Sequence, residues 1–323
     1  MSKAVRWISA AAFLAAAMVS PVAAQQWPEK PVRILVPFPP GGGTDIQARL
    51  LSGVFQKNTG QPFVVDNRTG ASGIIAAQLA VDSPPDGYTL LFTSGSISVV
   101  TTLHAKRMKF NPLTDLQPIS WLSSTPLVLS LHPSVPAKSV KELVALAKRK
   151  PGIMNAGGNS AGSTAHLSAE MLNQFAGLDS TVLFYRGGGP AVIALVSGEI
   201  DYIFATAPSI MPHYKAGKAR AIAVTTPKRS SAFPDLPTMN SFYPGFESDN
   251  WYAMFFPKNT PRPIVDRMNA EIKKALGSDE VRKFMVQEAL DPVASSPEEL
   301  TTHFKSDIER YAKVIKAGNI VVD

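Results

Sequence analysis

The sequence predicts an α/β fold arranged as two lobes, and three observations support this prediction. Beyond residue 25, short apolar runs alternate with segments that have the periodicity of amphipathic helices. A strand, a glycine-rich loop and a capped helix follow one another twice, about 120 residues apart. The C-terminal part of the chain has helical periodicity. Two copies of one architecture, followed by a helical tail, account for this pattern.

The first copy begins with the apolar run Val32–Val36, which predicts a strand that Pro37 ends. The proline- and glycine-rich stretch 38–43 predicts a loop. Thr44 and Gln47 have the spacing of a capping box, so the next helix is expected to begin at Thr44. Its buried face is predicted from the apolar residues that recur at helical spacing, which are Ile46, Leu50, Val54 and Phe55.

The second copy repeats this order. A strand is predicted over 127–131, and Ser139 with Glu142 has the spacing of a second capping box. A glycine-rich loop over 157–162 then precedes a helix that is expected to start near Ser163. The buried stripe of that helix is predicted to be Leu167, Met171 and Phe175.

Further helix starts also have sequence signals. A third glycine-rich loop, 186–189, precedes Pro190, a residue that is favoured in the first helical turn. Thr260 before Pro261 and Ser296 before Pro297 each combine a capping residue with such a proline. The remaining predicted elements are strands over 63–66, 88–92 and 200–205 and a helix over 74–79.

Residues 1–24 have the features of a secretory signal peptide. Lys3 and Arg6 form a basic start, the apolar run 7–19 is too short to span a bilayer, and small residues offer a cleavage site near Ala24. Cleavage there would lower the formal net charge from +7 to +5, because the segment has two basic and no acidic residues. The rest of the sequence has no run of about 20 apolar residues, so the mature protein is expected to be soluble.

Composition excludes several classes of function. The chain has no cysteine, which excludes disulfides, thiolate catalysis and cysteine-ligated zinc. The tight basic triplet 148–150 falls in the last turn of a predicted helix, where cations oppose the helix dipole, and does not indicate nucleic-acid binding. The five histidines are scattered without a second ligand nearby, so no metal or other cofactor is predicted.

The loops 41–43 and 157–162 each lie directly before the N-terminus of a predicted helix. A helix N-terminus has unpaired N–H groups and a partial positive charge, and glycine lets a ligand approach closely, which suits a carboxylate or a phosphate. Each such contact contributes ~0.3–1 kcal/mol, and up to ~2 kcal/mol when buried. Either loop alone could be a simple tight turn, but two favour binding. Neither has the spacing of a nucleotide-binding loop.

A serine hydrolase is the sharpest competing hypothesis. The stretch 158–162 matches a nucleophile elbow centred on Ser160, and the glycines of the first loop resemble an oxyanion loop. Asp201 or Asp235, followed by His303, has the chain order of such a triad. However, no histidine precedes the first glycine loop, and His303 falls inside a predicted helix. We therefore do not predict an enzyme.

Short motifs spread over the chain have a further implication. They lie at 27–31, 37–45, 65–73, 85–90, 162–167, 185–191, 198–201, 251 and 257–261. In combination they resemble the extracytoplasmic solute-binding receptors of tripartite tricarboxylate transporters, also called the Bug family. The resemblance covers essentially the whole mature chain, with three consecutive glycines at 41–43 as a slight variation on the usual loop.

The resemblance implies a two-lobed periplasmic binding protein, a type II-like Venus flytrap in which a hinge joins two Rossmann-like α/β domains. Residues 26–125 and 250–323 would form one lobe, and the inserted residues 126–249 the other. Such a receptor captures a small carboxylate (a di- or tricarboxylate, an acidic amino acid or an aromatic acid) and delivers it to membrane permease subunits. It is expected to be a periplasmic monomer without a cofactor. The ligand module of a periplasmic sensor for a signalling kinase would look alike in sequence and stays an alternative.

The resemblance also implies a set of ligand-binding residues. The first lobe would supply Phe38, Gly42, Gly43, Thr44 and Asp45. The second would supply Asn159, Ser160, Ala161, Ser163, Thr164 and His166. Ser94 and Ser96, which follow the third strand, are expected to face the same cleft, and Thr206 and Asp249 are further candidates. Two alternatives stay open: Asp45 could be a purely structural first-turn acid, and His166 could be packed rather than facing the cleft.

Overall fold

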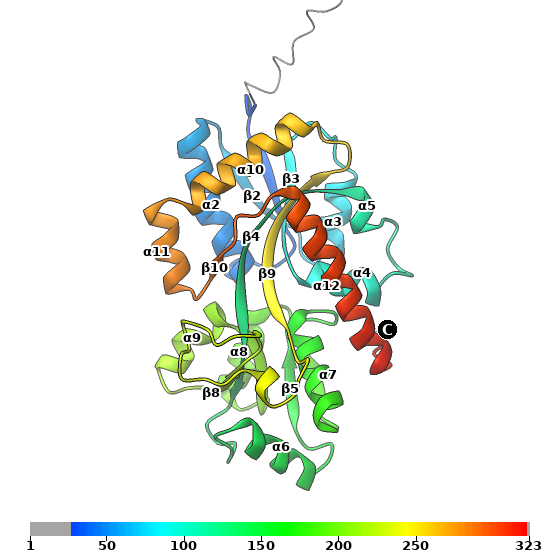
Figure 1. Ribbon diagram of the computed structural model, residues 1–323, viewed down its shortest axis with the longest axis vertical. Coiled ribbons are helices and arrows are strands. Elements are labelled where there is room, and N and C mark those ends of the chain that lie inside the picture. The colour runs from blue at the N-terminus through cyan, green and yellow to red at the C-terminus, as the bar shows by residue number, and fades with distance from the viewer. Residues whose placement is uncertain (1–26, 322–323) are drawn as a thin grey trace, which may run out of the picture.

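The computed structural model describes residues 27–321, so the predicted signal peptide lies outside the described residues. Figure 1 shows two lobes stacked along the long axis of the molecule. Two strands, β4 (Leu116–Leu131) and β9 (Asp249–Pro257), run between the lobes, and helix α12 (Pro297–Ala317) lies along one side. The predicted two-lobed α/β fold is therefore confirmed. No described helix is long and apolar enough to cross a membrane.

Lobe 1 is built on a sheet with the order β2-β1-β3-β9, in which β9 runs antiparallel to the other strands. Ile34 and Leu35 point to opposite faces of this sheet, as strand geometry requires, and belong to different apolar clusters. Helices α2, α10 and α11 cover one face, and α3, α4 and α12 cover the other. The bounds are β1 (Val32–Val36), α2 (Gly43–Thr59), β2 (Phe63–Asn67), η3 (Ala71–Gly73), α3 (Ile74–Val81), β3 (Thr89–Ser94), α4 (Ser96–Leu103), α5 (Pro112–Asp115), α10 (Arg262–Leu276), α11 (Asp279–Gln287) and β10 (Asp291–Pro292).

Lobe 2 repeats this layered arrangement. Its strands β6, β5 and β7 are parallel, and the C-terminal part of β4 pairs antiparallel with β7 and β8. Helices α6 and α7 pack on one face of the sheet, and α8 and α9 pack on the other. The bounds are α6 (Val140–Arg149), β5 (Asn155–Gly158), α7 (Thr164–Ala176), β6 (Thr181–Phe184), α8 (Gly188–Ser197), β7 (Tyr202–Thr206), α9 (Ala207–Lys215), β8 (Arg220–Val224) and η4 (Met239–Ser241).

The two lobes are joined by helix packing as well as by the strands that cross between them. Strand β4 pairs with β9 over 116–126 and with β7 over 127–131, so one strand belongs to both sheets. The C-terminal half of α12 then packs against α7 of lobe 2, where Tyr311 and Leu167 are buried together. The Gln174 side-chain amide donates a hydrogen bond to the Val314 carbonyl at 3.2 Å. Helix α12 therefore packs against lobe 2 on the outside of the hinge.

Most of the predicted helix caps are confirmed, and two are wrong. Ser163 caps α7, and Ser296 caps α12 with a complete capping box. Thr44 is not a cap, because α2 begins at Gly43 after an extended Gly42. Thr260 is not a cap either, because its hydroxyl donates to the Pro257 carbonyl and Pro261 takes the cap position.

Two predicted core positions are also wrong. Ile46, which was predicted on the buried face of α2, is 39% exposed. Leu167 and Met171 are buried on α7 as expected, but Phe175 is 42% exposed. Its ring lies at the rim of lobe 2 against Tyr243 and Phe246, with ring centroids 6.2 and 5.7 Å away. Helical periodicity places Phe175 on the correct face of α7, but the core of lobe 2 does not extend far enough to cover it.

Candidate functional site

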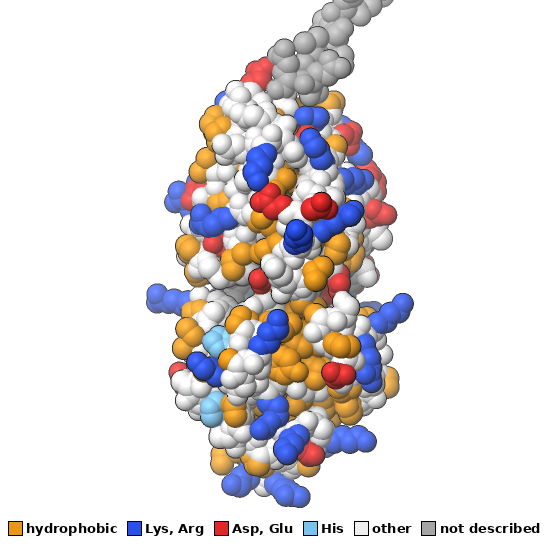
Figure 2. Space-filling model, turned by 90° about the vertical axis from the view of Figure 1, so that its left-hand side faces the viewer, with side chains coloured by type: hydrophobic (Ala, Val, Ile, Leu, Met, Phe, Trp, Pro, Cys, Tyr) orange, Lys and Arg blue, Asp and Glu red, His pale blue; other side chains and the backbone are white. Residues whose placement is uncertain are grey.

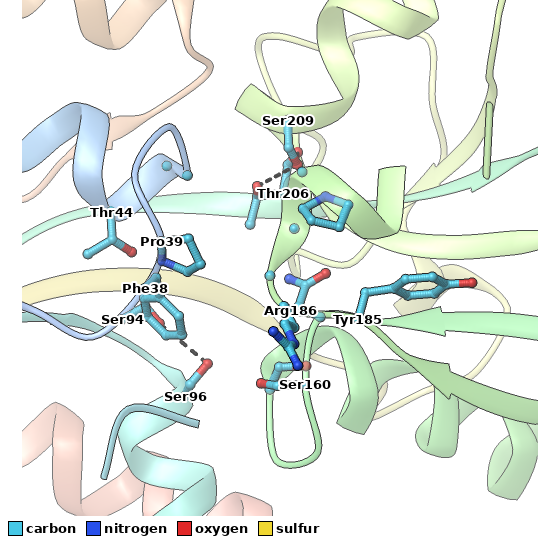
Figure 3. A pocket seen from close by; sticks show the side chains of 18 of the residues that line it. Phe38, Pro39, Thr44, Ser94, Ser96, Ser160, Tyr185, Arg186, Thr206 and Ser209 are labelled. Atoms are coloured by element: carbon cyan, nitrogen blue, oxygen red, sulfur yellow. Dashed lines mark hydrogen bonds between the residues drawn. The ribbon is translucent and has the colours of Figure 1, made fainter. Parts of the chain in front are cut away.

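A cavity of about 720 Å³ lies between the two lobes. Figure 3 shows Phe38, Pro39, Thr44, Ser94 and Ser96 on its lobe 1 side, facing Ser160, Arg186, Thr206 and Ser209 on its lobe 2 side. The other lining residues lie at 37, 40–43, 46, 69–73, 159, 163–164, 185, 187–190, 192–193, 208, 213, 250 and 252. The cavity therefore uses both halves of the chain.

Most of the lining residues follow the carboxyl ends of strands. Loops after β1, β2 and β3 supply the wall of lobe 1, and loops after β5, β6 and β7 supply the wall of lobe 2. This is the edge at which open α/β sheets bind ligands. Because each of β1, β5, β6 and β7 leads into a helix, the N-termini of α2, α7, α8 and α9 all open on the cavity.

The first glycine loop is shaped by its neighbours. Gly41 has a φ of 81°, in the left-handed region that favours glycine. A Cβ on Gly43 would lie 2.8 Å from the Tyr252 hydroxyl oxygen, so a side chain there would collide with the cavity wall. The backbone N–H groups of Gly43 and Thr44 have no acceptor among the described residues. They are therefore available to an anion in the cavity.

Asp45 holds the first glycine loop in place through hydrogen bonds. Its carboxylate accepts hydrogen bonds from the Gly41 N–H, the Arg49 guanidinium and the Asn67 amide, each at 2.9 Å. Burial opposes ionisation of Asp45, but these hydrogen bonds outweigh burial and lower its pKa. Asp45 is 2% exposed and does not line the cavity. It holds the loop in place, which agrees with the structural alternative.

His166 holds the glycine loop of lobe 2 in place in a similar way. Gly162 has a φ of 84°, and its N–H donates to Nδ1 of His166 at 3.0 Å. The ring is 3% exposed and packs edge-on against Phe184, with ring centroids 4.9 Å apart. In each lobe, therefore, a first-turn side chain reaches back four residues to accept the N–H of a left-handed glycine. His166 can accept this bond only while Nδ1 carries no proton.

The second loop also leaves donors free. Ser163 caps α7 by accepting the His166 N–H at 3.1 Å, and the N–H groups of Thr164 and Ala165 have no acceptor among the described residues. The Thr164 hydroxyl is 3.3 Å from the Asn250 side-chain oxygen of the crossing strand β9. Around the wall, Ser94 pairs with Ser96 at 3.3 Å and Thr206 with Ser209 at 2.9 Å. The cavity is thus lined with small hydrogen-bonding groups.

The structure brings most of the predicted residues to the cavity wall. Those that line it are Phe38, Gly42, Gly43, Thr44, Ser94, Ser96, Asn159, Ser160, Ser163, Thr164 and Thr206. Asp45, Ala161, His166 and Asp249 do not. The Ala161 carbonyl instead accepts a hydrogen bond from the Ser72 hydroxyl, which connects a loop of each lobe. Asp249 pairs with Arg310 at the hinge, at 3.4 Å.

Sequence reasoning missed several lining segments. The loop 69–73 and the loop 185–189 both line the cavity, as do Ser209, His213 and Tyr252. The glycines at 187–189 ahead of a helix were a usable signal for the second of these loops, because they repeat the pattern of the other two. The remaining residues had no local signal, since only the fold brings them to the wall.

The triad that a hydrolase needs is not assembled. None of Asp201, Asp235 and His303 lines the cavity that Ser160 faces. His303 stacks on Trp121 in lobe 1, with ring centroids 3.9 Å apart. One carboxylate oxygen of Asp201 accepts the Asn155 N–H at 2.7 Å. Among residues 27–321, no group of three or more His, Asp or Glu side chains is arranged to hold a metal ion.

His104 is a buried titratable side chain at the contact between the lobes. It follows α4 in lobe 1, is 8% exposed and lies beside the glycine loop of lobe 2. Burial lowers its pKa and outweighs the opposing effect of the Ala161 carbonyl, and the nearby charge of Arg107 lowers it further. The folded state therefore binds a proton less readily than the unfolded chain, in which histidine has its usual pKa of 6.5.

We therefore expect the contribution of His104 to stability to be complete above about pH 6.5 and to fall as the pH is lowered further. The measurement is urea denaturation between pH 8 and pH 5, with His104→Gln as the variant. His303 also has a lowered pKa, so only the difference between variant and wild type reports on His104. Equal pH slopes for the two proteins would contradict the expectation.

The fold and the cavity together define a two-lobed solute-binding protein. The family model described as "Tripartite tricarboxylate transporter family receptor" matches residues 47–320. BugT of Bordetella pertussis is 36% identical over 303 residues, which cover 93% of each chain. A protein encoded in the tcbD-tcbE intergenic region of Pseudomonas sp. strain P51 is 34% identical and covers 90% of this chain and 86% of its own. The chain belongs to the receptor family of tripartite tricarboxylate transporters, whose members are binding proteins and not enzymes.

Solved structures agree with this assignment. The R. palustris protein Rpa4515 with adipate superimposes with a TM-score of 0.87 at 34% identity, over 91% of this chain and 99% of its own. MatC from Rhodopseudomonas palustris with bound malate has a TM-score of 0.84 at 30% identity, over 90% of this chain and all of its own. The periplasmic binding protein BugD has a TM-score of 0.86 at 30% identity, over 91% and 99% of the two chains.

Proposed function

We propose that this protein is a periplasmic receptor that binds a small carboxylate between its lobes and delivers it to the permease subunits of a tripartite transporter. The signal peptide would be removed near Ala24, and the mature protein would act as a monomer without a cofactor. Residues 26–125 with 250–323 would move as one lobe and 126–249 as the other. Closure of the lobes would trap the ligand and present a new surface to the membrane subunits.

One observation carries this proposal: two helix N-termini with free N–H groups open on one cavity from opposite lobes. Gly43 and Thr44 belong to one, and Thr164 and Ala165 belong to the other. A carboxylate between them would accept hydrogen bonds from both lobes and would lie at the positive ends of both helix dipoles. The resulting grip needs both lobes, so binding would favour closure.

The solved relatives support the choice of a carboxylate. Rpa4515 was solved with adipate and MatC with malate, and both resemble this chain over nine-tenths of its length. The lining residues Phe38, Thr44, Ser160 and Thr164 are the ones that the family resemblance implies. A ligand module of a sensor would bind in the same way, so the partner of the closed form separates the two functions.

The proposal is tested by thermal unfolding of the mature protein with a panel of mono-, di- and tricarboxylates and the corresponding amides. A ligand present at 100 times its dissociation constant stabilises the folded state by about 2.7 kcal/mol. We expect at least one acid to raise the melting temperature and its full amide to leave it unchanged. A panel without any shift, together with no acid recovered by mass spectrometry from the purified protein, would refute carboxylate binding.

Delivery to a transporter is a separate claim with its own test. Membrane vesicles that contain the permease subunits should take up the acid identified above only when the liganded receptor is added. If the liganded protein instead stimulates a membrane-bound kinase and supports no uptake, the sensor alternative is correct.

A further inference from the structure

The inference drawn here rests on the proposed function and names the class of acid. Among the described residues that line the cavity there is no aspartate, glutamate or lysine, and Arg186 is the one side chain with a permanent charge. His213 is the other lining residue that can become positive. The cavity therefore has positive helix ends and a cation, but no group to neutralise a cation on the ligand.

The backbone of Arg186 is held firmly in place. Arg186 follows β6, and the N–H of the preceding Tyr185 donates to the Gly158 carbonyl at 2.9 Å. On its other side, the Gly187 N–H donates to the Asn159 carbonyl at 2.8 Å. Both bonds attach the loop to the β5 loop, which also contributes to the wall of lobe 2. The Tyr185 ring points away from the cavity, where its hydroxyl donates to Glu199 at 2.8 Å.

The Arg186 side chain is free to bind a ligand. It is exposed and makes no hydrogen bond or ion pair with any residue of 27–321. Figure 3 shows it on the lobe 2 side of the cavity, beside Ser160 and across from Phe38. A guanidinium presents N–H groups in a planar fork that matches a carboxylate. In lobe 2, by contrast, the Arg220 guanidinium is already occupied by the carbonyls of residues 133, 135 and 137.

Apolar groups occupy much of the wall between these polar sites. Phe38 and Pro39 lie on the lobe 1 side in Figure 3. Val192, Ile193 and Pro208, which belong to lobe 2, also line the cavity. Such a wall suits a hydrocarbon body, while the few polar groups determine the orientation of the ligand. Figure 2 shows lysine and arginine side chains spread over one outer face of both lobes, with acidic side chains among them.

We propose that the ligand is a dicarboxylate with an apolar body and no amino group, and that Arg186 binds its second carboxylate. One carboxylate is held by the starts of α2 and α7, and the other forms a forked ion pair with the guanidinium. An acidic amino acid of the same length is bound more weakly, because its ammonium group loses water without gaining a carboxylate partner. A monocarboxylate is bound more weakly because Arg186 stays unpaired.

The test is isothermal titration of the mature protein with straight-chain dicarboxylates from succinate to suberate, their monoamides and their 2-amino derivatives. The variant is Arg186→Gln, and the control is Arg149→Gln, which removes the same charge from the exposed end of α6 in the same lobe. We expect the best diacid to bind wild type about 10- to 100-fold more tightly than its monoamide. Arg186→Gln should abolish that preference and leave monoamide affinity unchanged, and Arg149→Gln should behave as wild type.

The outcomes separate this inference from the proposed function. If Arg186→Gln keeps the preference for the diacid over the monoamide, Arg186 is not the second binding group and the inference is wrong. If the 2-amino derivative binds wild type as tightly as the parent diacid, the exclusion of an ammonium group is wrong. If wild type binds none of the acids, including those of the wider thermal panel, the proposed function itself fails. Equal melting temperatures of the ligand-free proteins check that both variants are folded.

Discussion

Replacing Arg310 with methionine is expected to lower the free energy of unfolding by about 3 to 5 kcal/mol. Arg310 lies on α12 at the hinge, where its guanidinium pairs with Asp307 and Asp249 and donates to the Glu247 carbonyl at 3.0 Å. The side chain of Asp307 is 1% exposed. Burial raises the pKa of Asp249, and Arg310 opposes that shift. Without Arg310, two carboxylates would remain in the hinge with no cation to neutralise them.

The measurement is urea denaturation at pH 7, and Arg262→Met is the matched control. Arg262 also pairs with two carboxylates, those of Asp266 and Glu298, but all three side chains are more than half exposed. Exposed pairs contribute about 0 to 1 kcal/mol, so the control should be nearly as stable as wild type. The double variant Arg310→Met with Asp249→Asn should recover part of the loss. Similar stabilities for the Arg310 and Arg262 variants would contradict the importance of the buried network.

Replacing Asp45 with alanine is expected to weaken ligand binding at least about tenfold and to lower the free energy of unfolding by about 2 to 3 kcal/mol. The carboxylate accepts bonds from Gly41, Arg49 and Asn67, and all three donors would lose this acceptor. The Gly41 N–H is the bond that holds the first glycine loop against α2. Binding should therefore weaken although Asp45 itself does not line the cavity.

Asp66→Ala is the control for this prediction. Asp66 lies in the same lobe and is also ion-paired, in its case with Arg33 and Arg68. Its side chain is 24% exposed, and it does not line the cavity. Titration with the acid identified by thermal unfolding gives the affinities, and urea denaturation gives the stabilities. Asp66→Ala should keep wild-type affinity. If Asp45→Ala also binds like wild type, the loop keeps its shape without the carboxylate, and the positioning role is wrong.

The predicted starts of the helices beside the cavity agree with the structure where the sequence signal was local. The glycine at position 162, the capping serine at position 163 and the helical spacing after it lie within a few residues of one another, and α7 begins where they indicate. The same holds for the loop before α2, although the helix begins one residue before the predicted Thr44. Caps and left-handed glycines act through hydrogen bonds between near neighbours, so the sequence specifies them directly.

The prediction was incomplete where contacts join distant parts of the chain. Arg186 reaches the cavity because β6 pairs in parallel with β5, which places the loop 185–189 beside Asn159. Tyr252 reaches the wall through the pairing of β9 with β3. Asp249 lies on the same crossing strand but faces Arg310 at the hinge. Side chains alternate along a strand, so a shift by one residue decides which side each of them faces.

The sequence by itself determined the α/β class, the two copies of a strand, a glycine-rich loop and a helix, and the two helix N-termini that can receive an anion. These features follow from residue spacing and from backbone preferences that act over one or two helical turns. Only the tertiary structure decided which side chains hold those loops in place and which line the cavity. It assigned Asp45 and His166 to the first group and Arg186 to the second. That division depends on strand register and lobe packing, which contacts between residues far apart in the chain determine.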